Sequence, residues 1–242
     1  MHVPRWISRT IGVVVVLVLV VPLLWAQEPA KKAKSPPPTA EEVSRQFLSR
    51  HPQPRDEAEK RIVVVLEDMY VHQSRGMGNV LPEDGRLLRM LTETLGARQV
   101  VELGTSNGYS ALWFCLALRS TGGKLTTHEI DPQRIALAKE NFRRAGVEDL
   151  VMLVEGDAHE TIQKLAGPID LLLLDAEKEG LTDYLTKLLP RLRPGGLVIA
   201  HDSSGQAHLM QDYLRAIVSN PDLETVLVDA SRWGMCITRK MR

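Results

Sequence analysis

The chain has 242 residues, of which 44% are hydrophobic and 25% charged, a composition typical of a folded globular protein. Thirty Lys and Arg residues balance thirty Asp and Glu residues, which argues against nucleic acid as a partner because no net positive field draws the chain to it. Two cysteines, Cys115 and Cys236, are too few for a disulfide framework or a zinc site, so we expect buried thiols.

The first 27 residues predict a membrane segment. Arg5 and Arg9 precede an uncharged run from Ile11 to Leu24 that consists mostly of valine and leucine. The run is shorter than the roughly 20 residues that span a bilayer comfortably, so a signal peptide cleaved after Ala26 and an uncleaved anchor both remain open. We expect localisation at a membrane through residues 1–27, with export after cleavage as the alternative.

Residues 28–39 are rich in proline and lysine and predict an extended linker. The folded domain is expected over residues 40–242. Its first part, residues 40–75, has the composition of helices that cover a core, including one predicted over 55–72. An amphipathic helix over 83–95 leads into the centre of the domain.

From Val100 onward, short apolar runs alternate with helical patterns. Several runs are apolar throughout, as strands buried on both faces of a parallel sheet are. We therefore expect an α/β fold with a Rossmann-like, doubly wound, mostly parallel seven-stranded sheet, helices on both faces and a C-terminal antiparallel hairpin. The predicted strands are 100–103, 124–129, 151–155, 169–174, 197–200, 223–228 and 234–239, and the predicted helices between them are 111–118, 132–145, 159–165, 182–192 and 207–219.

Polar residues follow the ends of these predicted strands. They are the glycine-bearing turn 104–108, Glu129, Asp157, residues 175–178 and residues 201–203. Ligands of open α/β sheets bind beyond the carboxyl ends of the strands, where Glu129 can accept hydrogen bonds from ribose hydroxyls. The turn lacks the Gly-x-Gly-x-x-Gly spacing that fits a pyrophosphate, which favours a nucleoside ligand over NAD.

Five short motifs follow one another along this part of the chain: Glu102–Ser110, Glu129–Pro132, Gly156–Ala158, Asp175–Glu179 and Arg193–Gly196. In this order and spacing the chain resembles the class I S-adenosylmethionine-dependent methyltransferases, specifically the metal-dependent small-molecule O-methyltransferases that include catechol and caffeoyl-CoA O-methyltransferases. The likeness runs from about Gly76 to Arg239.

The resemblance implies S-adenosylmethionine as the cofactor. The residues that it assigns to the cofactor are Glu102, Gly104 and Ser110 at the methionine part, Glu129 at the ribose, Asp157 and Ala158 at the adenine, Val80 above the ligand, and Asp175. For Asp175, as for Asp202, the alternative is an ordinary turn residue at the end of a strand.

The resemblance also implies a divalent cation, with Mg²⁺ expected, held by Asp175, Asp202 and Ser203. Ser203 stands where the family usually has asparagine, which leaves a weaker neutral ligand. Lys178 matches the family's general base, a role that requires a lowered pKa, although it can also be read as a surface lysine. His201 is expected to be structural rather than a ligand, because imidazole matches a magnesium site poorly.

The expected function is that of an O-methyltransferase that moves a methyl group to a hydroxyl of a small catechol-like acceptor. The alternative is a membrane-tethered S-adenosylmethionine-binding module with weak or lost catalysis, which Ser203 and the altered residues 180–181 suggest. Because the cofactor is made in the cytosol, we expect a membrane-anchored domain to face the cytosol. The family resemblance further suggests a homodimer. The sequence does not identify the acceptor molecule.

Overall fold

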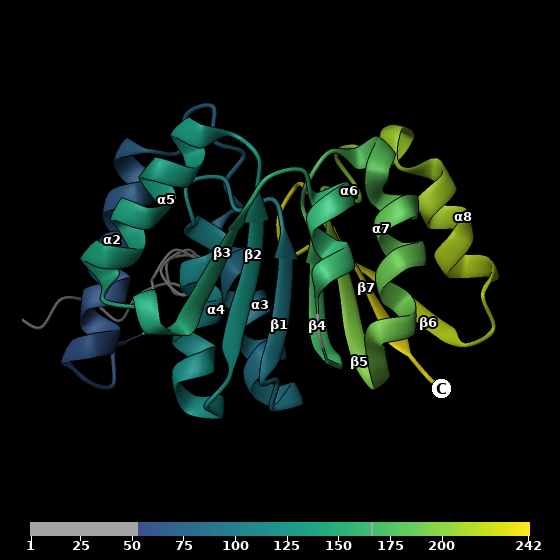
Figure 1. Cartoon of the computed structure of the whole chain (residues 1–242), viewed down its shortest axis with the longest axis horizontal. Coiled ribbons are helices and arrows are strands. Elements are labelled where there is room, and N and C mark those ends of the chain that lie inside the picture. Colours follow the sequence, from purple (N-terminus) through teal and green to yellow (C-terminus); the bar gives the residue numbers. More distant parts are fainter. Residues whose placement is uncertain (1–52, 166) are drawn as a thin grey trace, which may run out of the picture. The chain divides into compact units, whose positions relative to one another are not determined.

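A seven-stranded sheet lies at the centre of the part of the chain that the computed structural model describes, residues 53–165 and 167–242 (Figure 1). The strand order is β3-β2-β1-β4-β5-β7-β6. The first five strands run parallel, and β7 runs antiparallel to both β5 and β6. This confirms the predicted fold class. The strands are β1 (Gln99–Leu103), β2 (Lys124–Glu129), β3 (Val151–Glu155), β4 (Ile169–Leu174), β5 (Leu192–His201), β6 (Leu223–Val228) and β7 (Met235–Lys240).

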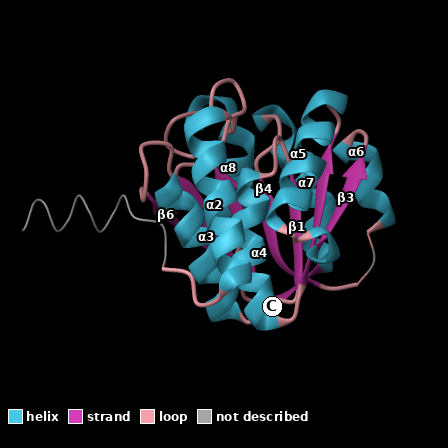
Figure 2. Ribbon diagram, turned by 90° about the vertical axis from the view of Figure 1, so that its left-hand side faces the viewer, coloured by secondary structure: helices cyan, strands magenta, loops and turns pink. Residues whose placement is uncertain are grey.

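Helices cover both faces of the sheet. The helices are α2 (Glu57–His72), α3 (Pro82–Leu95), α4 (Tyr109–Thr121), α5 (Pro132–Ala145), α6 (Ala158–Thr161), α7 (Leu181–Leu188) and α8 (Gln211–Ser219). Side chains of α2 to α5 share one buried cluster with the sheet, and those of α7 and α8 share a second. Figure 2 shows α2, α3 and α4 beside one another, and Figure 1 shows α6, α7 and α8 together on the other face.

Strand β1 separates these two cores. Neighbouring side chains of a strand point to opposite faces, and Val100 accordingly belongs to the cluster beneath α2 to α5, whereas Val101 belongs to the cluster beneath α7 and α8. Both side chains are buried. A strand covered on both faces is mostly apolar, as residues 171–174 of β4 are, but β1 also carries one fully buried polar residue, Glu102.

The bounds of α5 follow directly from its end residues. The side chain of Asp131 accepts hydrogen bonds from the backbone N–H groups of Gln133 and Arg134, at 2.7 and 3.1 Å, and Pro132 occupies the first turn. Gly146 then ends the helix with φ +67°, a left-handed conformation that glycine adopts without strain. The predicted helix over 132–145 therefore has the observed bounds.

Several predicted boundaries differ from the observed ones. Helix α7 stops at Leu188, and a short 3₁₀ turn, Leu189–Arg191, replaces its predicted end because Pro190 cannot continue the α-helical hydrogen bonds. Strand β5 begins at Leu192, earlier than predicted, and its pairing with β4 shifts register between Ile169 and Leu171. The predicted helix over 159–165 is divided into α6 and a 3₁₀ turn.

The prediction of membrane localisation, with its transmembrane helix, is corrected by the structure. No helix within residues 53–165 and 167–242 is long and apolar enough to cross a membrane. The segment on which that prediction rested, residues 1–27, lies outside the described residues, as do the predicted linker 28–39 and the first part of the helical cover. The predicted domain division therefore stays a prediction.

Candidate active site

A cavity of about 910 Å³ opens where β1, β2, β4 and β5 end. Strands β1 and β4 are neighbours, but β1 leads to α4 on one face of the sheet and β4 leads to α7 on the other. This arrangement opens a crevice at the strand ends of doubly wound folds. The predicted site residues that line the cavity are Val80, Gly104, Ser110, Glu129, Asp157, Ala158, Asp175, Lys178 and Asp202. Two predicted residues, Glu102 and Ser203, do not belong to its lining.

Gly104 allows the ends of β1 and β4 to approach one another closely. Its φ is +98°, and a Cβ atom at this position would lie 2.5 Å from the carbonyl oxygen of Asp175. The backbone N–H groups of Gly104 and Thr105 donate to the carbonyl oxygen of His128, which ties the same turn to β2. A residue with a side chain would clash here and would also be strained, so the position requires glycine.

Glu129 ends β2 and is held rigidly by backbone donors. Its Oε2 accepts from the N–H of Ser106 at 2.7 Å, and its Oε1 accepts from the N–H groups of Ile130 and Asp131 at 2.9 and 3.0 Å. An ionised carboxylate offers about four acceptor positions, so one remains for a donor in the cavity. The hydroxyl of a ribose is a donor of the required kind, in keeping with the role that the sequence suggests.

Glu102 lies behind the cavity wall instead of lining the cavity. Its side chain is fully buried in β1, where Ser110 Oγ donates to Oε1 at 2.5 Å and Thr127 Oγ1 donates to Oε2 at 2.6 Å. Burial raises the pKa of Glu102 to about 8, so the carboxyl group is protonated at neutral pH. Glu102 can therefore influence a ligand in the cavity only indirectly, through its hydrogen bond with Ser110, which lines the cavity.

Lys178 lies buried between two carboxylates at the other end of the cavity. Its Nζ is 3.0 Å from Asp175 Oδ1 and 3.2 Å from Asp202 Oδ2, and the side chain is 7% exposed. Burial disfavours the charged ammonium, but the two carboxylates outweigh this effect and raise the pKa of Lys178 above its ordinary value. In this arrangement Lys178 is an ammonium ion rather than a free base.

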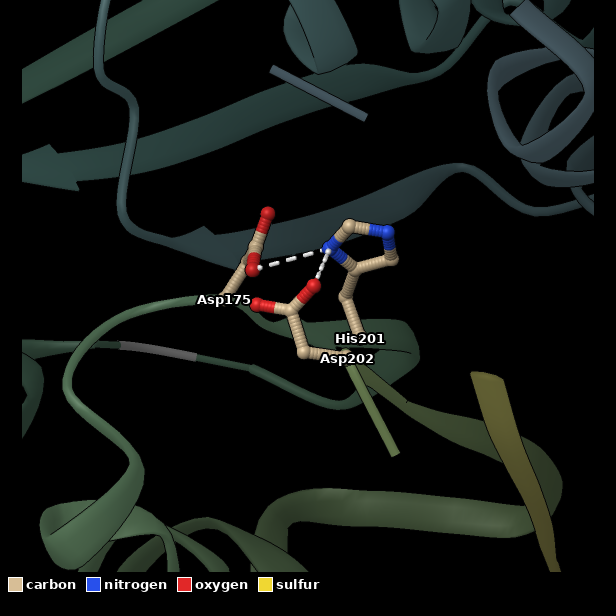
Figure 3. A group of neighbouring side chains, drawn as sticks. All are labelled: Asp175, His201 and Asp202. Atoms are coloured by element: carbon tan, nitrogen blue, oxygen red, sulfur yellow. Dashed lines mark hydrogen bonds and ion pairs between the residues drawn. The ribbon is translucent and has the colours of Figure 1, made fainter. Parts of the chain in front are cut away.

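His201 joins the same cluster. Its Nδ1 lies 3.2 Å from Asp175 Oδ1 and 3.3 Å from Asp202 Oδ1, as the dashed lines in Figure 3 show, and its Nε2 lies 3.3 Å from Asp84 Oδ2. Burial opposes a charge on the ring, yet the surrounding carboxylates, Asp175 first, raise the pKa of His201 to about 10. Asp84 comes from α3 and was not among the residues predicted from the sequence.

Ser203 points away from the cluster. Its Oγ donates to the carbonyl oxygen of Ala200 at 2.7 Å and accepts from the backbone N–H of Cys236 at 3.0 Å, so the hydroxyl links β5 to β7. By contrast, one donor atom each from Asp175, His201 and Asp202 lie within 4.8 Å of one another. Two carboxylates and a ring nitrogen can together hold a divalent cation. The residues therefore fit such an ion, but with a different third ligand from the predicted one.

A further group of polar side chains lies on the cavity wall at the predicted adenine end. His159 contacts Asp183 and Glu177 at 2.5 and 2.9 Å, and Tyr184 stacks on its ring and donates to Glu177 Oε1 at 2.6 Å. Sequence reasoning missed this group, because no spacing distinguishes these residues from an ordinary polar helix surface. Asn79, also missed, lines the cavity with an amide group that has no hydrogen-bond partner among the described residues.

A model of the O-methyltransferase family matches residues 55–218. Over 126 residues the chain is 37% identical to a protein named catechol O-methyltransferase from Niastella koreensis. The aligned segment covers 50% of this chain and 57% of that protein. The chain thus spans little more than half the length of this curated relative.

Solved structures with a similar fold include two methyltransferases that contain SAH. One is an SAH-bound methyltransferase from Podospora anserina, 21% identical, with a TM-score of 0.71 over 85% of this chain and 98% of that one. The other is an O-methyltransferase from Bacillus cereus in complex with SAH, 23% identical, with a TM-score of 0.68 over 82% of this chain and 97% of that one. At these identities the likeness shows the fold alone.

Proposed function

The chain belongs to the O-methyltransferase family, and we propose that it transfers the methyl group of S-adenosylmethionine to a hydroxyl of a small catechol-like molecule. One observation carries this proposal. A single cavity joins a carboxylate suited to a ribose, that of Glu129, to the buried cluster of Asp175, Lys178 and Asp202. The first half suits a nucleoside donor and the second half suits an acceptor with polar oxygens.

The donor half would hold S-adenosylmethionine, which supplies a methyl group on a positively charged sulfur. Glu129 has one acceptor position left for a ribose hydroxyl, and Ser110 presents its Oγ where the methionine part is expected. The unpartnered amide of Asn79 also favours a polar ligand, since buried polar groups are normally hydrogen-bonded. The absence of a pyrophosphate-binding glycine pattern agrees with a nucleoside of this kind.

The acceptor half favours a molecule with two adjacent oxygens. Asp175 and Asp202 flank Lys178, so the cluster offers charged partners on both sides of one buried ammonium. As a cation, Lys178 stabilises an acceptor oxygen that loses its proton, which makes that oxygen a stronger nucleophile. The role of general base would first require Lys178 to lose a proton, which the two carboxylates oppose. We therefore propose that it acts as the ammonium.

The reaction is a displacement in which the hydroxyl oxygen bonds to the methyl carbon and the carbon–sulfur bond breaks. The proton of the hydroxyl passes to one of the two carboxylates that flank Lys178, that of Asp175 or that of Asp202. The side chains of Lys178, Asp175 and Asp202 are 7, 11 and 14% exposed, so few water molecules contact the reacting groups. Alignment of the two reactants and loss of the positive charge on sulfur in such a place account for most of the expected rate enhancement.

Incubation of the purified chain with isotopically labelled S-adenosylmethionine and a panel of catechols tests the proposal. Mass spectrometry should detect label on one oxygen of the catechols, and much less on acceptors whose second hydroxyl is missing. Transfer to single hydroxyls at the same rate would contradict the catechol-like acceptor. Binding of S-adenosylmethionine without transfer to any acceptor would favour the alternative, a binding module with lost catalysis. The homodimer expected from the family stays a prediction.

A further inference from the structure

Three donor atoms converge at the acceptor end of the cavity. Asp175, His201 and Asp202 each direct one atom to a common region less than 4.8 Å across, and in Figure 3 dashed lines join the Nδ1 atom to one oxygen of each carboxylate. Their side chains are 11, 2 and 14% exposed, so water competes little with a bound ion. The group is thus a preorganised set of two oxygens and one nitrogen.

The far side of the His201 ring has the partner that a metal-binding histidine usually has. Nε2 lies 3.3 Å from Oδ2 of the fully buried Asp84, and Ser231 Oγ donates to the same oxygen at 2.5 Å. Histidine ligands almost always donate their other N–H to a carboxylate, carbonyl or water, which fixes the tautomer and the ring orientation. A proton on Nε2 leaves the lone pair of Nδ1 directed at Asp175 and Asp202.

The charges of the cluster leave room for a dication. The carboxylates of Asp84, Asp175 and Asp202 contribute three negative charges, and the ammonium of Lys178 offsets one of them. With a neutral His201, two negative charges remain in a nearly dry place, and a divalent cation balances both. Protonation of the His201 ring balances only one of these two negative charges.

The third ligand decides which metal suits this set. Because the Ser203 hydroxyl bonds Ala200 and Cys236, the imidazole of His201 replaces a neutral oxygen ligand. Mg²⁺ takes oxygen ligands, whereas imidazole suits Fe²⁺, Ni²⁺, Cu²⁺ and Zn²⁺. Mn²⁺ binds sites of nitrogen and oxygen ligands most weakly among the first-row dications, so a preference for Mn²⁺ over Mg²⁺ is the most demanding form of the comparison. We infer that Asp175, His201 and Asp202 bind a first-row transition-metal dication in preference to Mg²⁺. This inference rests on the proposed function, because the metal would have the role of holding an acceptor oxygen beside Lys178.

Titration of the chelator-treated full chain with MnCl₂ and, separately, MgCl₂ tests this inference by calorimetry. We expect Mn²⁺ to bind at least tenfold more tightly than Mg²⁺. His201→Gln should weaken Mn²⁺ binding by about 10- to 100-fold, as loss of a ligand or of its support does in metal sites. His208→Gln, a change of an exposed histidine in the same segment, is the matched control and should leave the affinity unchanged.

Pulsed electron paramagnetic resonance of the Mn²⁺-loaded wild-type chain gives a second readout that does not depend on any variant's folding. Coupling of the manganese to a ring nitrogen is expected. Absence of this coupling, equal affinity for both metals, or no metal binding would overturn the inference. Binding of S-adenosylmethionine and transfer of its methyl group are measured on the same sample. Methyl transfer without nitrogen coupling refutes only the ligand set, and nitrogen coupling without cofactor binding refutes only the proposed function.

Discussion

Replacing Glu102 with glutamine separates the charge of this buried carboxyl group from its hydrogen bonds. The amide has nearly the same size and can still accept from Ser110 or Thr127, but it cannot ionise. In the wild-type chain, burial raises the pKa of Glu102 to about 8 from its ordinary 4.5. The variant should therefore change how stability depends on pH more than it changes the fold.

The sign of the effect follows from proton binding. Between about pH 4.5 and pH 8 the folded chain holds a proton on Glu102 that the unfolded chain releases. The stabilisation is complete below the lower value and is lost as the pH rises through the upper one, at about 1.4 kcal/mol per pH unit. From pH 5 to pH 8 the free energy of unfolding of the wild-type chain should thus fall by about 3.5 kcal/mol relative to Glu102→Gln.

Urea denaturation of both proteins at several pH values between 5 and 8 measures this difference directly. Other groups titrate in the same range, but they do so in both proteins and cancel in the comparison. Glu160→Gln, a change of an exposed carboxylate on α6, serves as the control and should show no such trend. Parallel stability curves for the wild-type chain and Glu102→Gln would refute the assignment of a protonated carboxyl group behind Ser110.

Three other substitutions test the site. Lys178→Ala should lower kcat by about 100-fold and change the affinity for S-adenosylmethionine less than threefold, whereas exposed Lys164→Ala should change neither; an unchanged kcat would exclude the ammonium from the reaction. Glu129→Gln should weaken cofactor binding by about tenfold in calorimetry, and Glu155→Gln, its register partner on β3, should not; equal affinities would remove the ribose contact. Gly104→Ala should cost about 2 kcal/mol or more in urea denaturation, against about 1 kcal/mol for Gly96→Ala, where a Cβ meets no atom within 4 Å; similar losses would mean that the contact with Asp175 is not tight.

Much of the fold could be predicted because its local signals agree with its packing. Strands β2, β3 and β4 have the predicted bounds, since each is an extended run that ends at a turn or an acidic residue. Helix α5 is bounded by Asp131 and Gly146, whose capping roles are visible in the sequence. The start of β5 was missed because the strand continues through Pro194–Gly196, residues that normally interrupt a strand.

The candidate site was predicted less completely, because side-chain direction depends on backbone details that spacing does not give. His201, Asp202 and Ser203 are neighbours, yet the left-handed backbone of Asp202, at φ +64°, turns their side chains in different directions. As a result His201 faces Asp175, and Ser203 turns to the backbone of β7. Asp84 lies 117 positions from His201, so only the packing of α3 over the sheet brings the two together.

Calorimetric titration of the full chain with S-adenosylmethionine, and separately with NAD, shows which nucleoside-containing ligand the cavity binds. We expect S-adenosylmethionine to bind with a Kd in the micromolar range, Glu129→Gln to weaken this binding, and NAD to give no heat of binding. Tight binding of NAD together with no binding of S-adenosylmethionine would contradict this expectation.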